Sequence, residues 1–133
     1  FIARYTGIVP AHCMIKHLFA GELRGGNHLA GAIQKRSTLV YCAPNEQESI
    51  YHDEFVNLAT GHSIFHYVPV VLSGIAHAEG DHRPVIETIA PLVEGRRDLL
   101  PMISGTKAFV QPLRTYFTDL GFGRKEIRHE TYD

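Results

Sequence analysis

Five short runs rich in apolar and β-branched residues recur along the chain, and longer stretches with helical periodicity separate them. This alternation is typical of βαβ units, in which parallel strands form one sheet and the connecting helices cover its faces. The runs occupy residues 1–4, 37–42, 64–72, 99–104 and 126–131. The sequence therefore predicts an α/β fold with three layers, α/β/α, around a five-stranded parallel sheet.

Two helices have clear boundaries in the sequence. The first is predicted over 46–59, where apolar residues recur at helical spacing, glutamates occupy the first turn and Gly61 follows the end. The second is predicted over 111–120, with apolar residues on one face and Gly121 as its C-terminal stop. By contrast, the stretch 21–36, with its Gly-Gly pair and mixed polarity, is expected to be a mobile insertion.

Composition favours one domain and argues against several classes of partner. The 133 residues carry 13 Lys and Arg against 14 Asp and Glu, with no basic stripe, so nucleic acid is not expected as a partner. No apolar run approaches the roughly 20 residues of a membrane span, and a cytoplasmic location is expected. Cys13 and Cys42 fall in a predicted helix and a predicted strand, which favours two buried thiols over a disulfide.

The turn after the first run is the first candidate site. The chain passes through Thr6 and Gly7 directly into an apolar, helix-like segment that contains Pro10. A strand that ends in a glycine turn and opens a helix is a place where a pyrophosphate can bind, because unpaired helix N-terminal amides point toward it. A second glycine turn, at 104–106, follows the fourth run.

From end to end the chain resembles the NAD(P)-binding domain of the ferredoxin-NADP reductase superfamily. In that family the first strand ends in Gly-Gly-Thr-Gly-x-x-Pro; here Thr6, Gly7 and Pro10 match this motif, whereas Arg4 and Tyr5 do not. The family's Cys-Gly-x-Pro-x-Met after the fourth strand corresponds to residues 104–109, of which only the glycine is kept. Residues 129–132 are similar to the family's closing His-x-Glu-aromatic.

The resemblance implies the strand order 3-2-1-4-5. The order of the strands then reverses between the first and the fourth, so both glycine turns would face one crevice. It also implies that 1–133 is a pyridine-nucleotide-binding domain, a fragment of a longer flavoprotein whose flavin lobe lies upstream. Expected cofactor-binding residues are Thr6, Gly7, Pro10, Ala43, Pro44, Asn45, Ser73, Gly105, Thr106, Lys107 and Phe109.

Four further residues receive roles from the resemblance. Ser104 replaces the family cysteine near the nicotinamide and, with Glu130 of the closing motif, is a catalytic candidate; alternatively, Ser104 only satisfies backbone groups at a strand end. Tyr5 and Tyr132 are expected on the face turned toward the flavin lobe, although Tyr5 could instead obstruct the nucleotide pocket. Arg4 could pair with a phosphate or with a carboxylate of a neighbouring domain.

The residues after the third strand bear on the choice of cofactor. Members of the family that prefer NADPH use basic residues there to bind the 2′-phosphate, but Gly74 stands in place of the family arginine, leaving Ser73, His77 and Arg83. NADH is therefore expected in preference to NADPH, with FAD or FMN in the full-length parent. An iron-sulfur centre or another acceptor would receive the electrons.

No metal site is predicted from the nine histidines. His62 and His66 lie on a predicted strand, where a separation of four residues is about 13 Å, and no further ligand completes a metal-binding set with His12 and His17.

Two function classes remain open. One is the NADH-binding module of a flavin-dependent reductase, which passes hydride to a flavin; the other is a noncatalytic descendant of that fold, retained for packing or partner binding.

Overall fold

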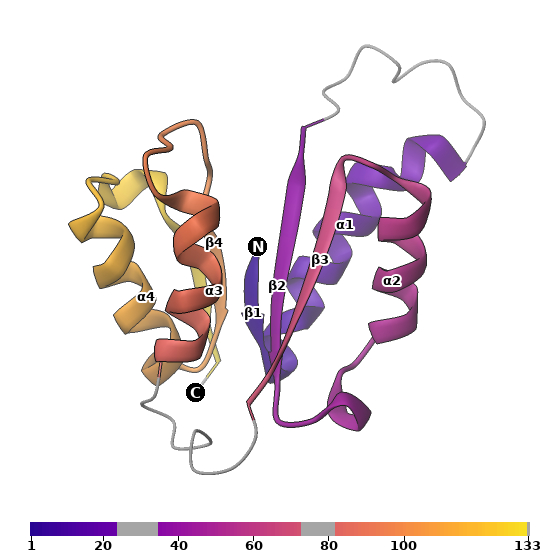
Figure 1. Ribbon diagram of the computed structural model, residues 1–133, viewed down its shortest axis with the longest axis horizontal. Coiled ribbons are helices and arrows are strands. Elements are labelled where there is room, and N and C mark those ends of the chain that lie inside the picture. Colours follow the sequence, from indigo (N-terminus) through magenta and orange to yellow (C-terminus); the bar gives the residue numbers. More distant parts are fainter. Residues whose placement is uncertain (24–34, 73–81, 133) are drawn as a thin grey trace.

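Five parallel strands form a single sheet, as the sequence pattern predicts, and their order is β3-β2-β1-β4-β5, as the family resemblance implies. The computed structural model describes residues 1–23, 35–72 and 82–132 (Figure 1). Each strand falls within a predicted run or extends it by one residue, and its ends differ from the prediction by at most three residues. The strands are β1 (Ile2–Arg4), β2 (Ser37–Ala43), β3 (Phe65–Val71), β4 (Met102–Gly105) and β5 (Arg128–Thr131).

Four α-helices within the described residues cover the two faces of this sheet, giving the predicted three layers (Figure 1). α1 (Ile8–Leu23) and α2 (His52–Gly61) lie on one face, and α3 (Arg83–Val93) and α4 (Lys107–Asp119) lie on the other. Each face has its own apolar core, because alternate residues of a strand point to opposite sides. Leu39, Tyr41 and Ala43 of β2 pack on the α1 and α2 side, and Val40 and Cys42 pack on the other.

The helix predicted over 46–59 begins later than expected. Residues Glu46–Glu48 form a separate 3-10 turn, η3, and α2 begins at His52. The side chain of Asn45 caps η3, because its Oδ1 accepts from the backbone N–H of Glu48 at 2.9 Å, and Tyr51 then adopts a left-handed φ of 63°. Gly61 is the last residue of α2 rather than the residue beyond it.

The helix predicted over 111–120 starts one turn earlier, at Lys107, because Thr106 caps it. Its predicted stop is confirmed: Gly121 has a φ of 98°, and the Phe122 N–H donates to the Phe117 carbonyl at 3.0 Å. The two phenylalanine rings pack edge to face 5.4 Å apart, which completes a Schellman motif.

Two smaller expectations need correction. α1 continues to Leu23, so the stretch 21–36 begins as helix; the remainder of the expected insertion, 24–34, lies outside the described residues. Both cysteines are free, as expected, but Cys13 is exposed and only Cys42 is buried. No helix among the described residues is long and apolar enough to cross a membrane.

Candidate nucleotide-binding site

The turns after β1 and β4 meet at the carboxyl edge of the sheet, which lies toward the bottom of Figure 1. A Cβ atom on Gly7 would lie 2.5 Å from the carbonyl oxygen of Ser104 and 2.8 Å from the nitrogen of Gly105. Only a glycine allows this approach. The Oγ of Ser104, a residue 8% exposed, donates to the carbonyl oxygen of Gly7 at 2.5 Å. Thus the two predicted glycine turns lie in direct contact.

The turn after β1 is a short 3-10 turn, η1 (Tyr5–Gly7), that leads into α1. Tyr5 has a φ of 51°, a left-handed conformation that costs a residue with a side chain about 1–2 kcal/mol. This conformation gives a physical reason for the family glycine at this position. Tyr5 is half-buried and its carbonyl accepts from the Tyr41 hydroxyl at 3.4 Å, whereas Thr6 is exposed.

The turn after β4 opens α4. The side chain of Thr106 accepts a hydrogen bond from the Phe109 backbone N–H at 3.4 Å, so its hydroxyl oxygen serves as the helix cap. Lys107 is exposed at the first helical position. Phe109 is only 1% exposed and forms part of the core below the turn, so its ring supports the crevice instead of lining it.

Arg4 ends β1 and is 3% exposed, on the sheet face covered by α3 and α4. Its guanidinium donates to the Tyr5 hydroxyl at 3.4 Å and lies 4.8 Å from that ring's centroid and 5.8 Å from the centroid of Phe109. The Nε of Arg4 has no hydrogen-bond partner in the described part of the chain. Within residues 1–23, 35–72 and 82–132, this buried cation at the carboxyl edge therefore makes one weak hydrogen bond.

The turn after β2 contributes three expected residues. Ala43 is buried, and Pro44 and Asn45 are half-buried. Both polar atoms of the Asn45 side chain bind Glu48, since its Nδ2 also donates to the Glu48 carboxylate at 2.9 Å. Asn45 thus shapes the turn in this state. The expected ligand Ser73 lies outside the described residues.

The end of β5 lies at the same edge, two strands away from β1. Glu130 is exposed and in register with Ser104, and the Tyr132 N–H donates to the carbonyl of Gly105 at 3.1 Å. Tyr132 is 39% exposed. With strands about 4.8 Å apart, Tyr5 and Tyr132 follow strands that are roughly 10 Å apart.

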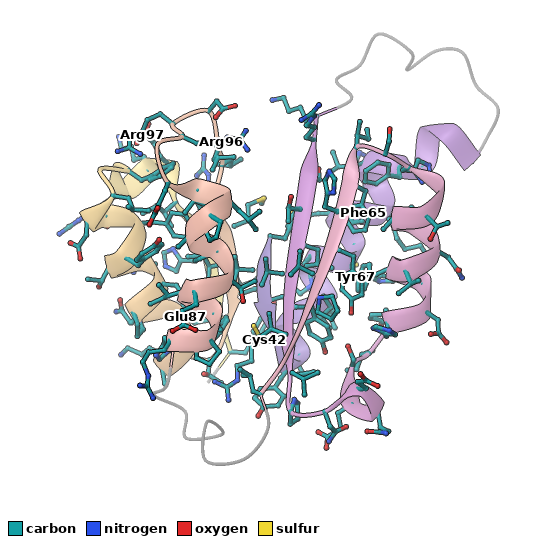
Figure 2. All side chains as sticks on the ribbon, viewed as in Figure 1. Cys42, Phe65, Tyr67, Glu87, Arg96 and Arg97 are labelled. Atoms are coloured by element: carbon teal, nitrogen blue, oxygen red, sulfur yellow. The ribbon has the colours of Figure 1, made fainter. Side chains whose placement is uncertain are left out.

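Cys42 is the buried neighbour of Arg4 across β1 and β2. Burial raises the pKa of the Cys42 thiol to about 12, although the positive charge of Arg4 acts in the opposite direction. At neutral pH this thiol is therefore protonated and unreactive. Figure 2 shows Cys42 between the sheet and the α3 and α4 layer, near the carboxyl ends of the strands.

An ionic cluster joins α1 to α2 beside this edge, and sequence reasoning did not find it. His12 Nε2 lies 3.0 Å from a carboxylate oxygen of Glu54, and Lys16 approaches the other oxygen at 3.4 Å. The His12 ring also stacks on Tyr51, with centroids 3.8 Å apart. The acidic first turn of α2 was the available signal, but no spacing rule links it to a histidine 42 residues earlier.

One groove among the described residues lies elsewhere. A groove of about 1280 Å³ runs along the opposite edge of the sheet, and its apolar lining includes Phe1, Val40, Val68 and Ile89. The glycine turns and the helix N-termini that favour nucleotide binding do not line it. Among the described residues there is no cluster of three or more His, Cys, Asp or Glu that could hold a metal ion.

These features define an α/β domain in which two glycine turns meet at the point where strand order reverses, the place where open parallel sheets bind ligands. No protein-family model matches the chain, and no curated protein matches it by sequence. Solved structures do match. A ferredoxin-NADP+ reductase from Plasmodium falciparum aligns with a TM-score of 0.78 at 20% identity, over 99% of this chain and 52% of that chain. A second structure of that reductase, with 2′P-AMP, aligns at 0.70 and 18% identity over the same shares.

A flavohemoglobin from Malassezia yamatoensis with bound FAD and heme has a TM-score of 0.71 at 12% identity, over 99% of this chain and 30% of that chain. The chain spans about half or less of the length of each of these structures. It has the fold found in these oxidoreductases, so the resemblance to the ferredoxin-NADP reductase superfamily is confirmed at the level of the fold.

Proposed function

We propose that this chain is the NADH-binding module of a flavin-dependent reductase, in which hydride passes from the nucleotide to a flavin held by an upstream domain. The observation that carries the proposal is the contact of Gly7 with Ser104 and Gly105. It brings the N-termini of α1 and α4 to one crevice at the strand-order reversal. Neither helix has an acidic residue in its first turn, which leaves both ends suited to an anion.

In this function the chain's own residues bind and orient the nucleotide, since the two cofactors supply the redox chemistry when bound. Thr6 and Thr106, with the backbone amides that follow them, would hold the phosphates. Ser104 acts through its hydrogen bond to Gly7 and is therefore a positioning residue for the crevice. Glu130 and Tyr132, exposed at the end of β5, would face the flavin domain.

The electron acceptor in this proposal is an iron-sulfur centre or another one-electron acceptor. The alternative, a noncatalytic descendant of the fold, is favoured by one observation: Arg4 and Tyr5 stand where the family has two glycines, and Tyr5 partly covers the turn. A module of that kind would pack or bind a partner without binding a pyridine nucleotide.

Calorimetric titration of the intact protein with NADH and NADPH separates these alternatives. We expect NADH to bind at micromolar to submillimolar concentration and more tightly than NADPH. Failure of both nucleotides to bind at millimolar concentration would refute the reductase proposal and favour a noncatalytic descendant of the fold.

Two smaller probes test the cofactor preference directly. AMP and 2′P-AMP differ only in the 2′-phosphate, and 2′P-AMP is present in several matching structures of the Plasmodium falciparum reductase. Because Gly74 replaces the basic residue expected after the third strand, we expect 2′P-AMP to bind this chain no more tightly than AMP. Tighter binding of 2′P-AMP would reverse the preference to NADPH while leaving the reductase proposal intact.

A further inference from the structure

Arg4 is a buried cation without a matching anion among the described residues. It is only 3% exposed, and its interactions within the described part of the chain are all with neutral groups: the Tyr5 hydroxyl and the rings of Tyr5 and Phe109. No carboxylate of the described residues forms an ion pair with it. Because an arginine remains charged in proteins, burying it without a hydrogen-bonded counter-charge is unfavourable.

The edge of the guanidinium that carries Nε is the side that an oxyanion would occupy. The Nε atom is buried and has no partner among the described residues, and the hydrogen bond from the terminal nitrogen to Tyr5 is long, at 3.4 Å. A guanidinium binds phosphate and carboxylate groups through two parallel N–H donors. An anionic ligand would therefore supply the acceptors that the N–H donors of Arg4 lack.

The surroundings of Arg4 favour an anion as well. The Cβ of Arg4 lies 3.6 Å from the position that a Cβ on Gly105 would take, and a ring carbon of Phe109 lies 2.8 Å from that position, so Arg4 and the Phe109 ring both pack closely against Gly105 at the start of α4. Glu130, an acidic residue on β5, is in register with Ser104 and so lies on the opposite face of the sheet from Arg4.

We propose that Arg4 binds the pyrophosphate of the nucleotide, and that Tyr5 occupies the guanidinium until the nucleotide arrives. The inference rests on the proposed function and assigns a side chain to a part of the ligand that the family's two glycines would approach with backbone alone. Binding then requires Tyr5 to leave the guanidinium. A rotation of the Tyr5 side chain is enough for this, because the guanidinium touches only its hydroxyl and its ring.

The test is calorimetric titration of the intact protein with inorganic pyrophosphate, NADH and adenosine, comparing the wild type with Arg4→Gln. Loss of a charged hydrogen-bond partner should weaken pyrophosphate and NADH binding by about 10- to 100-fold and leave adenosine binding unchanged. Arg97→Gln is the matched control, because Arg97 also lies over a ring, Phe122, at 5.3 Å but at the far edge of the sheet (Figure 2).

A folded Arg4→Gln protein with unchanged affinity for pyrophosphate and NADH would overturn the inference, and would be the result if Arg4 paired with a carboxylate of another domain. If Arg4→Gln fails to fold, Tyr5→Phe decides. It removes the hydroxyl that competes for the guanidinium but keeps the ring, so pyrophosphate affinity should rise by about 2- to 10-fold. No change in Tyr5→Phe would refute the proposed exchange.

The same titrations separate this inference from the proposed function. If the wild type binds NADH and Arg4→Gln binds it equally well, the function stands and the role of Arg4 is wrong. If the wild type binds pyrophosphate through Arg4 but binds neither pyridine nucleotide, the phosphate site stands and the reductase proposal is wrong.

Discussion

Replacing Gly7 with alanine should separate the two turns that form the crevice. The new Cβ would lie 2.5 Å from the Ser104 carbonyl oxygen, whereas nonbonded contacts of carbon have their optimum near 3.5–4.0 Å, so the turns must move apart by about 1 Å. That movement breaks the 2.5 Å hydrogen bond from Ser104. Overpacking and the lost hydrogen bond together should lower the free energy of unfolding by about 2–4 kcal/mol.

The assay is urea unfolding of the intact protein followed by circular dichroism, with NADH titration below the unfolding transition. We expect NADH affinity to fall at least tenfold. Gly61→Ala is the control, because nothing lies within 4 Å of the added methyl group and position 61 is helical; it should be neutral or slightly stabilising, by up to about 1 kcal/mol. If Gly7→Ala unfolds within 0.5 kcal/mol of the wild type, on the order of the usual effect of a surface substitution, the contact does not hold the site together.

Three further predictions concern single side chains. Ser104→Ala should lower the free energy of unfolding by about 1 kcal/mol in the same urea assay, and an unchanged midpoint would show that its hydrogen bond adds nothing. Burial raises the pKa of Glu54, but His12 and neighbouring charges outweigh this effect and hold the pKa below the ordinary 4.5, so the pair stabilises the fold above that pH and not once the carboxylate is protonated. Glu54→Gln should therefore destabilise by less than about 1 kcal/mol at pH 7, the screened range for an exposed pair, and its effect should shrink as the pH falls and the carboxylate becomes protonated; a loss that stays equal at low pH would contradict the assignment. Iodoacetamide should modify the exposed Cys13 in the native protein and reach Cys42 only on unfolding, as mass spectrometry of digested protein can establish.

The architecture could be predicted because its signals are local. Each strand is a short apolar run, and Gly121 marks the end of α4 through a left-handed turn that few other residues adopt. The meeting of the two glycine turns followed once the resemblance supplied the strand order. Their contact through Gly7 depends on the same order, because parallel neighbours bring their carboxyl ends to one edge.

What the sequence did not reveal depends on how side chains meet across elements. Helical spacing predicts too early a start for α2, because the Asn45 side chain caps a separate turn. The spacing of apolar residues does not show that a side chain competes with the backbone for hydrogen bonds. The burial of Arg4 went unnoticed for a similar reason, since charged residues are usually exposed. The family glycines were the missed signal, because a glycine often marks a position of positive φ, which Tyr5 adopts.

The hydrogen bond from Ser104 to Gly7 joins residues 97 positions apart, and it affects how the molecule is made. During synthesis β1 emerges first and finds a partner in β2 after some forty residues, but its other neighbour, β4, is translated only after most of the chain has been made. Until then one side of β1 has no strand beside it, and the crevice has only one of its walls. Since closing so long a loop is entropically unfavourable and slow, we expect the nucleotide site to be among the last parts of the domain to form.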